Sequence, residues 1–231
     1  MPEHETASQS RENLWTGVDG HFTDLFIPAD PILDAALAAN AAAGLPSIDV
    51  APNQGKFLHL LARMNGARRI LEIGTLGGYS TIWLARALPA DGQLITMEYE
   101  PKHAAVAQSN IDRAGLANRV QIRVGAALDS LAQLATEQPA PFDIIFIDAD
   151  KPNNPGYLAW ALKFSRPGTV IIGDNVVRDG AILDPADPDP RVQGTRRFLE
   201  LLAAEPRVSA TALQTVGSKG YDGFAMALVL R

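Results

Sequence analysis

Two motifs in the sequence end apolar runs in oxygen-bearing side chains. The run FDIIFID closes on Asp148, with Lys151 three residues later, and the run TVIIGD closes on Asp174, which Asn175 follows. Carboxylate and amide oxygens suit Mg²⁺ and are poor ligands for zinc. If the two runs are neighbouring strands, about 4.8 Å apart, their carboxyl ends can bring these side chains together. The motifs therefore predict a divalent-cation site formed by Asp148, Asp174 and Asn175.

Lys151 would lie beside this expected cation. The like charge of the cation would favour the neutral amine, which could then take a proton from a substrate hydroxyl. Two alternatives remain open, because Asp and Asn also end strands as turn formers and helix caps. Lys151 could likewise form a salt bridge with Asp150 or lie at a solvent-exposed helix start. Both motifs at one edge favour the catalytic interpretation.

The glycine-rich turn EIGTLGGYS (Glu72–Ser80) follows another apolar run and opens a predicted helix. Its glycines let the backbone approach a ligand closely. The dinucleotide fingerprint, counted from Gly74, would need glycine where the chain has Leu76 and Tyr79, and a G-K-[ST] phosphate loop is also missing. The turn therefore suits a nucleoside ligand and not a pyrophosphate.

Two later strand ends extend this nucleoside hypothesis. Glu98 follows Gly74 by 98 − 74 = 24 residues and can accept hydrogen bonds from both ribose hydroxyls, as in enzymes that bind NAD. Gly125 and Ala126 end the next run and leave room for a flat ring beside the backbone. A nucleoside that carries a ribose and lacks a pyrophosphate points to S-adenosylmethionine.

A strand–helix alternation must position these residues. Five apolar runs are expected to be strands: 69–73, 93–98, 120–124, 142–148 and 169–174. The stretches between them carry apolar residues at three- and four-residue spacing, which predicts helices over 79–88, 101–114, 126–135 and 155–165. This alternation predicts right-handed βαβ crossovers and a parallel sheet covered on both faces, so the fold class is α/β.

Further elements are expected on both sides of this alternation. The runs 207–213 and 223–230 are separated by turn residues, which predicts a closing antiparallel hairpin. The segments 31–44 and 53–65 are expected to be helices before the sheet.

The segment 178–191 is irregular, because its prolines and aspartates exclude an interior helix or strand. It is expected to be a solvated loop or a lid over the strand ends. We interpret 1–231 as a single domain, with an N-terminal helical extension at 1–66 and a cofactor-binding sheet core at 67–231.

Composition excludes several classes of partner. The chain of 231 residues is 47% hydrophobic, enough for a sizeable core, and its net charge of −6 disfavours nucleic acid and anionic membranes. It contains no cysteine, which excludes disulfides and thiolate metal sites. No apolar run approaches the roughly 18 residues needed to span a bilayer. A soluble, cytoplasmic protein is expected.

Four motifs occur in one order and spacing: LEIGTLGGYS, ITMEYEPKHAAVA, FIDADKPNN and IIGDNVVRDG. Together they resemble the cation-dependent class I O-methyltransferases, which include caffeoyl-CoA and catechol O-methyltransferases and bacterial relatives. The resemblance covers roughly residues 30–231. It implies a Rossmann-like, doubly wound, seven-stranded and mostly parallel sheet, and in many members a homodimer.

The resemblance also implies a role for each matching residue. The family's metal ligands fall on Asp148, Asp174 and Asn175, and its proposed base falls on Lys151. The residues expected to bind the cofactor S-adenosylmethionine are Val50, Glu72, Gly74, Gly78, Ser80, Glu98, Gly125, Ala126 and Asp148. The implied reaction is Mg²⁺-dependent methylation of a small catechol-like phenol, with Mn²⁺ or Ca²⁺ as other metals that such a site accepts.

Two other functions stay open at this point. A nicotinamide-dependent oxidoreductase shares the sheet and Glu98 but lacks the glycine fingerprint. A dimeric scaffold could keep the methyltransferase fold without its chemistry, although intact Asp148, Lys151 and Asp174 argue against it.

Overall fold

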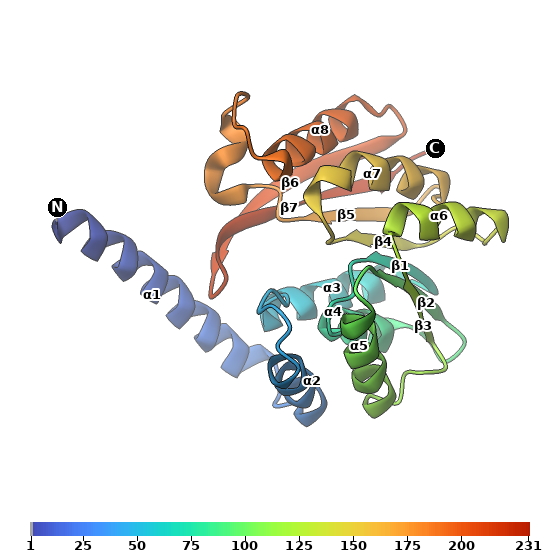
Figure 1. The fold of residues 1–231 in the computed structure, drawn as a ribbon, viewed down its shortest axis with the longest axis horizontal. Helices are drawn as coiled ribbons and strands as arrows, with labels where there is room; N and C mark the ends of the chain where they lie inside the picture. The colour runs from blue at the N-terminus through green and yellow to red at the C-terminus, as the bar shows by residue number, and fades with distance from the viewer. Residues whose placement is uncertain (1) are drawn as a thin grey trace.

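The computed structural model describes residues 2–231, and its centre is one mixed sheet (Figure 1). The seven strands lie in the order β3-β2-β1-β4-β5-β7-β6. They are β1 (Arg69–Ile73), β2 (Gln93–Glu98), β3 (Val120–Val124), β4 (Ile144–Ile147), β5 (Val170–Asp174), β6 (Val208–Gly217) and β7 (Gly220–Val229). β1 to β5 pair in parallel, while β7 is antiparallel to both β5 and β6. The predicted α/β class and C-terminal hairpin are confirmed.

Helices cover both faces of the sheet (Figure 1). The α-helices are α1 (Pro2–Phe26), α2 (Pro31–Ala42), α3 (Pro52–Asn65), α4 (Tyr79–Ala87), α5 (Pro101–Arg113), α6 (Ala127–Thr136), α7 (Asn154–Lys163) and α8 (Pro190–Ala204), and the 3₁₀ turns are η1 (Lys151–Asn153) and η2 (Arg178–Leu183). The helices α2 to α5 lie on one face, and α6 to α8 on the other (Figure 1).

The strands alternate their side chains between two apolar layers, as buried parallel strands do. Ile70, Ile144 and Phe146 pack on the face covered by α3 and α4. Leu71 and Ile145 pack on the other face, against α6 to α8. With both faces buried, polar side chains that follow the strands can gather only at the edges of the sheet.

Two local features of the C-terminal half differ from expectation or were not predicted. The hairpin turn has only Ser218 and Lys219 between its strands, so β6 and β7 are longer than the runs 207–213 and 223–230. Helix α8 was not predicted, because its start lies in the Pro/Asp segment. Asp189 caps it by accepting a hydrogen bond from the Arg191 N–H at 2.8 Å.

Helix α1 extends away from the rest of the molecule (Figure 1). Its Asp19 carboxylate accepts a hydrogen bond from the backbone N–H of Ser218 at 2.8 Å, which joins the helix to the hairpin turn. Across residues 2–231, no helix has both the length and the apolar character needed to cross a membrane.

Candidate active site

A cavity of about 930 Å³ opens at the carboxyl ends of β1, β2, β4 and β5. Here the chain runs outward from the middle of the sheet in both directions, the position at which open α/β sheets bind ligands. Of the residues predicted for the site, those that line this cavity are Val50, Gly74, Ser80, Glu98, Ala126, Asp148, Lys151, Asp174 and Asn175. Three others, Glu72, Gly78 and Gly125, are not in its lining.

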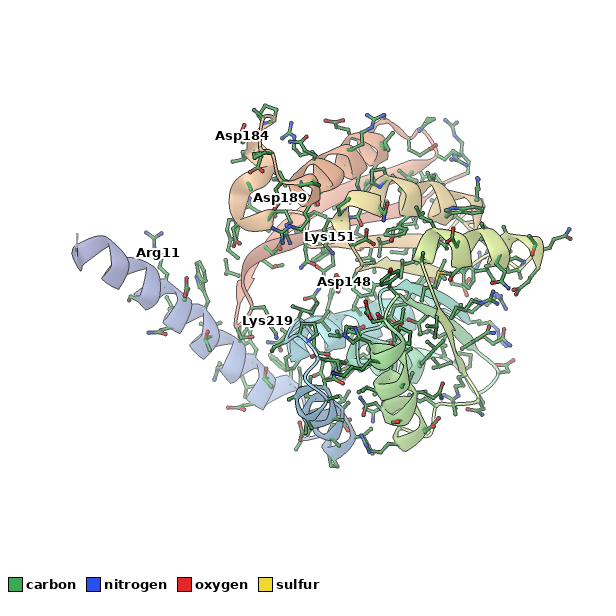
Figure 2. All side chains as sticks on the ribbon, in the orientation of Figure 1. Arg11, Asp148, Lys151, Asp184, Asp189 and Lys219 are labelled. Carbon is green, nitrogen blue, oxygen red and sulfur yellow. The ribbon has the colours of Figure 1, made fainter. Side chains whose placement is uncertain are left out.

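The ends of β4 and β5 bring two carboxylates together. Ile147 pairs with Gly173 in the parallel register, so the next residues, Asp148 and Asp174, lie on adjacent strands. The Lys151 Nζ donates to the Asp148 Oδ1 at 3.0 Å, although Lys151 itself is only 7% exposed. Figure 2 shows Asp148 and Lys151 near the middle of the molecule, well inside its outline. Lys151 therefore pairs with Asp148 and not with Asp150.

Asp174 is a buried carboxylate whose hydrogen-bond donors are neutral. Its Oδ2 accepts from the Gln54 Nε2 at 2.6 Å, and its Oδ1 accepts from the Asn175 N–H at 2.8 Å. Burial and the nearby Asp148 carboxylate raise the pKa of Asp174. A bound cation would remove this repulsion, so the site fits a positively charged ligand.

The donor set is consistent with a hard cation. Asn175 lines the cavity beside Asp174 and has φ +55, an uncommon backbone angle for a residue other than glycine. Among the side chains that the structure describes, residues 10–231, no three or more His, Cys, Asp or Glu are grouped to hold a metal ion. The predicted set is of a different kind, since it has two carboxylates and one amide oxygen.

The glycine turn lies directly against the end of β4. Gly74 has φ +103, and a Cβ at this position would lie 2.0 Å from the Asp148 carbonyl oxygen, so no other residue fits. Leu76 also has a positive φ, of +50, and its N–H donates to the Glu98 Oε2 at 2.7 Å. The hydrogen bond to Glu98 thus stabilises a positive φ at Leu76, a position where the dinucleotide fingerprint would have glycine.

The Glu98 carboxylate accepts hydrogen bonds from the glycine turn and from the residue before the next helix. Its Oε2 also accepts from the Thr75 N–H at 3.3 Å, and its Oε1 accepts from the Glu100 N–H at 3.0 Å. The His103 Nδ1 lies 3.4 Å from Oε1, and His103 also lines the cavity. The carboxylate therefore reaches the cavity with its position fixed by backbone donors.

Glu72 lies beneath the cavity in a hydroxyl network. It is fully buried and accepts hydrogen bonds from the hydroxyls of Ser80 at 2.7 Å, Thr81 at 2.5 Å and Thr96 at 2.7 Å. Burial raises the pKa of Glu72 to about 7, because the three hydroxyls offset only part of the desolvation. Ser80 thus connects the buried carboxylate to the cavity wall.

Two predicted glycines are explained by backbone geometry. Gly78 has φ +84 at the start of α4, and a Cβ there would lie 3.4 Å from the Ala107 Cβ on α5. Gly125 has φ +137 and its N–H donates to the Glu98 carbonyl at 2.9 Å. Both shape the turns beneath the site, and direct contact of either with a cofactor stays a prediction.

Asp150 is held by α7 and η1. Its Oδ1 accepts from the Tyr157 hydroxyl at 2.5 Å, and its Oδ2 accepts from the Asn153 Nδ2 at 2.6 Å. Asp150 also lines the cavity, so it shapes the wall without contacting the lysine beside it in the sequence.

Sequence reasoning missed several residues of the cavity. Gln54 bonds to Asp174 from the first turn of α3, and Asp49 lines the opposite side. Arg178 and Arg191, the two ends of the irregular segment, line the cavity, as does Lys219 of the hairpin turn. Only the helix start PNQGKF, which precedes the first strand, offered a sequence signal for Gln54.

The irregular segment itself points away from the site between its two ends. The residues 183–186 are exposed, and Figure 2 places Asp184 at the outer end of the loop, far from Lys151. Of the two expectations, the structure therefore favours a solvated loop over a lid.

Known proteins resemble this chain along nearly its whole length. The sequence profile described as O-methyltransferase matches residues 29–228. A curated catechol O-methyltransferase of Niastella koreensis is 58% identical over 216 residues, which make up 94% of this chain and 98% of that protein.

Two solved structures share both backbone and sequence with this chain. The O-methyltransferase from Bacillus cereus, in complex with SAH, is 65% identical with a TM-score of 0.93, covering 94% of this chain and 99% of that chain. TomG from Streptomyces achromogenes, an O-methyltransferase in complex with SAM, is 53% identical with a TM-score of 0.92, covering 95% and 99%.

Proposed function

We propose that this chain, which belongs to the O-methyltransferase family and is an S-adenosylmethionine-dependent O-methyltransferase, methylates a hydroxyl of a small catechol-like phenol with the help of a divalent cation. One observation carries the proposal: Asp148, Asp174 and Lys151 meet on one wall of the cavity. The proposal replaces the oxidoreductase and scaffold alternatives.

We assign the half of the cavity near β1 and β2 to the cofactor. Glu98 is placed to accept hydrogen bonds from ribose hydroxyls, and Ala126 and Val50 line the same space. The open backbone at Gly74 and the hydroxyl of Ser80 would meet the methionine end. When bound, the cofactor supplies an electrophilic methyl group on a sulfonium.

We assign the half near β4 and β5 to the cation and the acceptor. Asp148, Asp174 and Asn175 would hold Mg²⁺ or a similar hard cation, because such cations prefer oxygen ligands. The two carboxylates also give this ligand set a negative charge, which a cation would balance. When bound, the cation lowers the pKa of an adjacent acceptor hydroxyl. A vicinal diphenol would place two neighbouring oxygens beside the side chains that would hold the cation, which favours it as the acceptor. The name of the Niastella koreensis relative, catechol O-methyltransferase, supports this acceptor class.

We assign to Lys151 the removal of the proton from that hydroxyl. Its Nζ stands 3.0 Å from Asp148, next to the expected cation ligands, so it can accept the proton as the oxygen–methyl bond forms and the methyl–sulfur bond breaks. With the cation bound, the like charge would favour the neutral Lys151 amine, which Asp148 holds in position by accepting a hydrogen bond from it. Holding donor and acceptor in one closed cavity supplies much of the acceleration, since well-oriented pairs gain about 7–11 kcal/mol.

Metal removal tests the proposal. We expect a chelator to abolish methyl transfer to a catechol and added Mg²⁺ to restore it, as followed by chromatography of the methylated product. Asp174→Asn should lose most of this activity and keep cofactor affinity by calorimetry, because Asp174 lies in the other half of the cavity. Activity that is indifferent to the chelator would contradict the cation assignment.

We also propose that the protein acts as a cytoplasmic homodimer. Exposed apolar side chains support a second copy as partner: Leu14, Val18 and Phe22 on α1, and Leu213 and Val216 on β6. Light scattering should give twice the mass of 24.7 kDa, and the monomer mass at micromolar concentration would rule the dimer out.

A further inference from the structure

Arg178 is held rigidly at the cavity by an unusual backbone. It has φ +54 and its neighbour Asp179 has φ +53, angles that non-glycine residues adopt only where the surroundings impose them. The Asp222 Oδ1 imposes them by accepting the N–H groups of Val177 at 2.9 Å and Arg178 at 3.1 Å. The segment after the expected cation ligand Asn175 is therefore fixed in one conformation.

The guanidinium of Arg178 has no hydrogen bond to any of residues 10–231, whose side chains the structure describes. Its Nε is buried without a partner, and its nearest carboxylate oxygen, the Asp222 Oδ2, is 3.9 Å from Nη1, which is too far for a hydrogen bond. A guanidinium is always charged and presents a planar set of donors that matches a carboxylate. Leaving the Nε donor buried and unpaired costs free energy, which a bound anion would recover.

Two acids near Arg178, Asp189 and Asp222, already accept hydrogen bonds from other donors. Asp189 lies close enough to be influenced by Arg178, but its carboxylate already accepts hydrogen bonds from the Arg191 side chain at 2.6 and 2.9 Å. Lys219 lines the same cavity from the hairpin turn (Figure 2). The Oδ1 of Asp222 is occupied by the backbone N–H groups of Val177 and Arg178.

We propose that Arg178 binds a carboxylate on the methyl acceptor, so that the preferred acceptor is a catechol that carries an acidic substituent. This inference rests on the proposed function. Arg178 follows Asn175 by three residues, a span of at most about 11 Å, so one aromatic acceptor can reach both the cation ligands and the guanidinium. The cofactor half of the cavity lies at the other strands, which makes the acceptor the occupant.

A matched pair of acceptors tests the inference: 3,4-dihydroxybenzoate and its neutral amide, 3,4-dihydroxybenzamide, with saturating Mg²⁺ and S-adenosylmethionine. The wild-type protein should prefer the benzoate. Arg178→Met should lower kcat/KM for the benzoate about 10- to 100-fold, mainly through KM, and change it less than about 2-fold for the benzamide. Arg178→Lys should lose less, because it keeps the charge. All three side chains meet the same positive φ, so the variants add no backbone strain.

Arg197→Met is the control variant. Arg197 is exposed on α8 and pairs only with Glu200 among the described residues, so its removal changes the net charge equally and should change neither acceptor's kinetics. Equal losses for both acceptors, no loss for the benzoate, or a raised KM for the cofactor in Arg178→Met would each overturn the inference. If the wild-type protein methylates the benzamide without favouring the benzoate, the inference fails and the proposed function stands. If it methylates neither, both fail.

Discussion

The parallel strands begin at one edge of the sheet, the amino edge, and end at the opposite one, the carboxyl edge. Each of these edges holds a buried aspartate, and the two carboxylates have opposite surroundings. At the amino edge, Asp143 accepts hydrogen bonds from the N–H groups of Arg68 at 2.8 Å and Arg69 at 2.9 Å, and from the Arg166 guanidinium. Burial alone would raise its pKa, but these donors hold the pKa of Asp143 below its usual value. At the carboxyl edge, burial and Asp148 raise the pKa of Asp174. A carboxylate with a full set of donors is structural, whereas one with few donors and a like charge nearby is available to a ligand.

The two cavities differ in the same way. The cavity at the amino edge, about 370 Å³, is lined by charged groups that already pair, such as Arg68 with Asp91 and Arg166 with Asp143. The cavity at the carboxyl edge is larger, about 930 Å³, and includes Asp174 and Arg178, whose charges are incompletely matched. The number of charges around a cavity therefore says less about binding than their pairing does.

Replacing a basic side chain at each edge, Lys151 at the carboxyl edge and Arg166 at the amino edge, should give the largest difference. Lys151→Met should lower turnover at pH 7 by about 100-fold or more, since it removes the proposed base. Activity should recover in part towards pH 10, where a phenol ionises unaided. Arg166→Met should leave turnover unchanged and cost at most about 1 kcal/mol of unfolding free energy, because its side chain is 53% exposed. A flat pH profile for Lys151→Met would argue against the base role.

Removing the aspartate at each edge should affect stability unequally. Asp143→Ala should lose roughly 3 kcal/mol of unfolding free energy at pH 7, because two backbone N–H groups lose their acceptor. The folded-state pKa of Asp143 is depressed, so its contribution is present above the unfolded value of about 3.9 and disappears as the pH falls below that. Urea unfolding at pH 7 and pH 3 measures this difference.

Asp174→Asn provides the contrast to Asp143→Ala. Its raised pKa means that the charge opposes folding at neutral pH, so the variant should unfold at the same urea concentration as the wild-type protein or a higher one. Equal destabilisation by the two substitutions would break the distinction between the edges.

Glu72 gives a smaller, pH-dependent test of the same idea. Burial raises its pKa to about 7 in the folded chain, above the unfolded value of 4.5, so the folded state binds more protons between these values. The contribution of Glu72 to stability should therefore be fully present below about pH 4.5 and fall by about 2 to 3 kcal/mol as the pH rises through 7. Glu72→Gln should lack this decrease when urea unfolding is compared at pH 5 and pH 8. The same decrease in the variant would assign it to another group.

Local patterns in the sequence were sufficient to predict most elements and the edge of the site. Apolar periodicity is a property of each segment, so the five parallel strands were placed to within two residues at each end. Asp148 and Asp174 could be identified because the apolar runs end at them, and Lys151 because it follows Asp148 by three residues. Helix α8 and the ends of the hairpin were missed, since a proline at the first helical position and a two-residue turn give weak local signals.

Only the tertiary structure decided how these groups are paired. Asp143 and Asp148 bracket the same strand and look alike in the sequence, yet only the fold gives Asp143 its donors from the loop before β1. Gln54 reaches Asp174 across 120 residues, and Asp222 fixes Arg178 across 44 residues. The sequence by itself determined which residues end the strands and at which edge. Their charge state and their availability to a ligand depend on contacts between distant segments, which local periodicity does not encode.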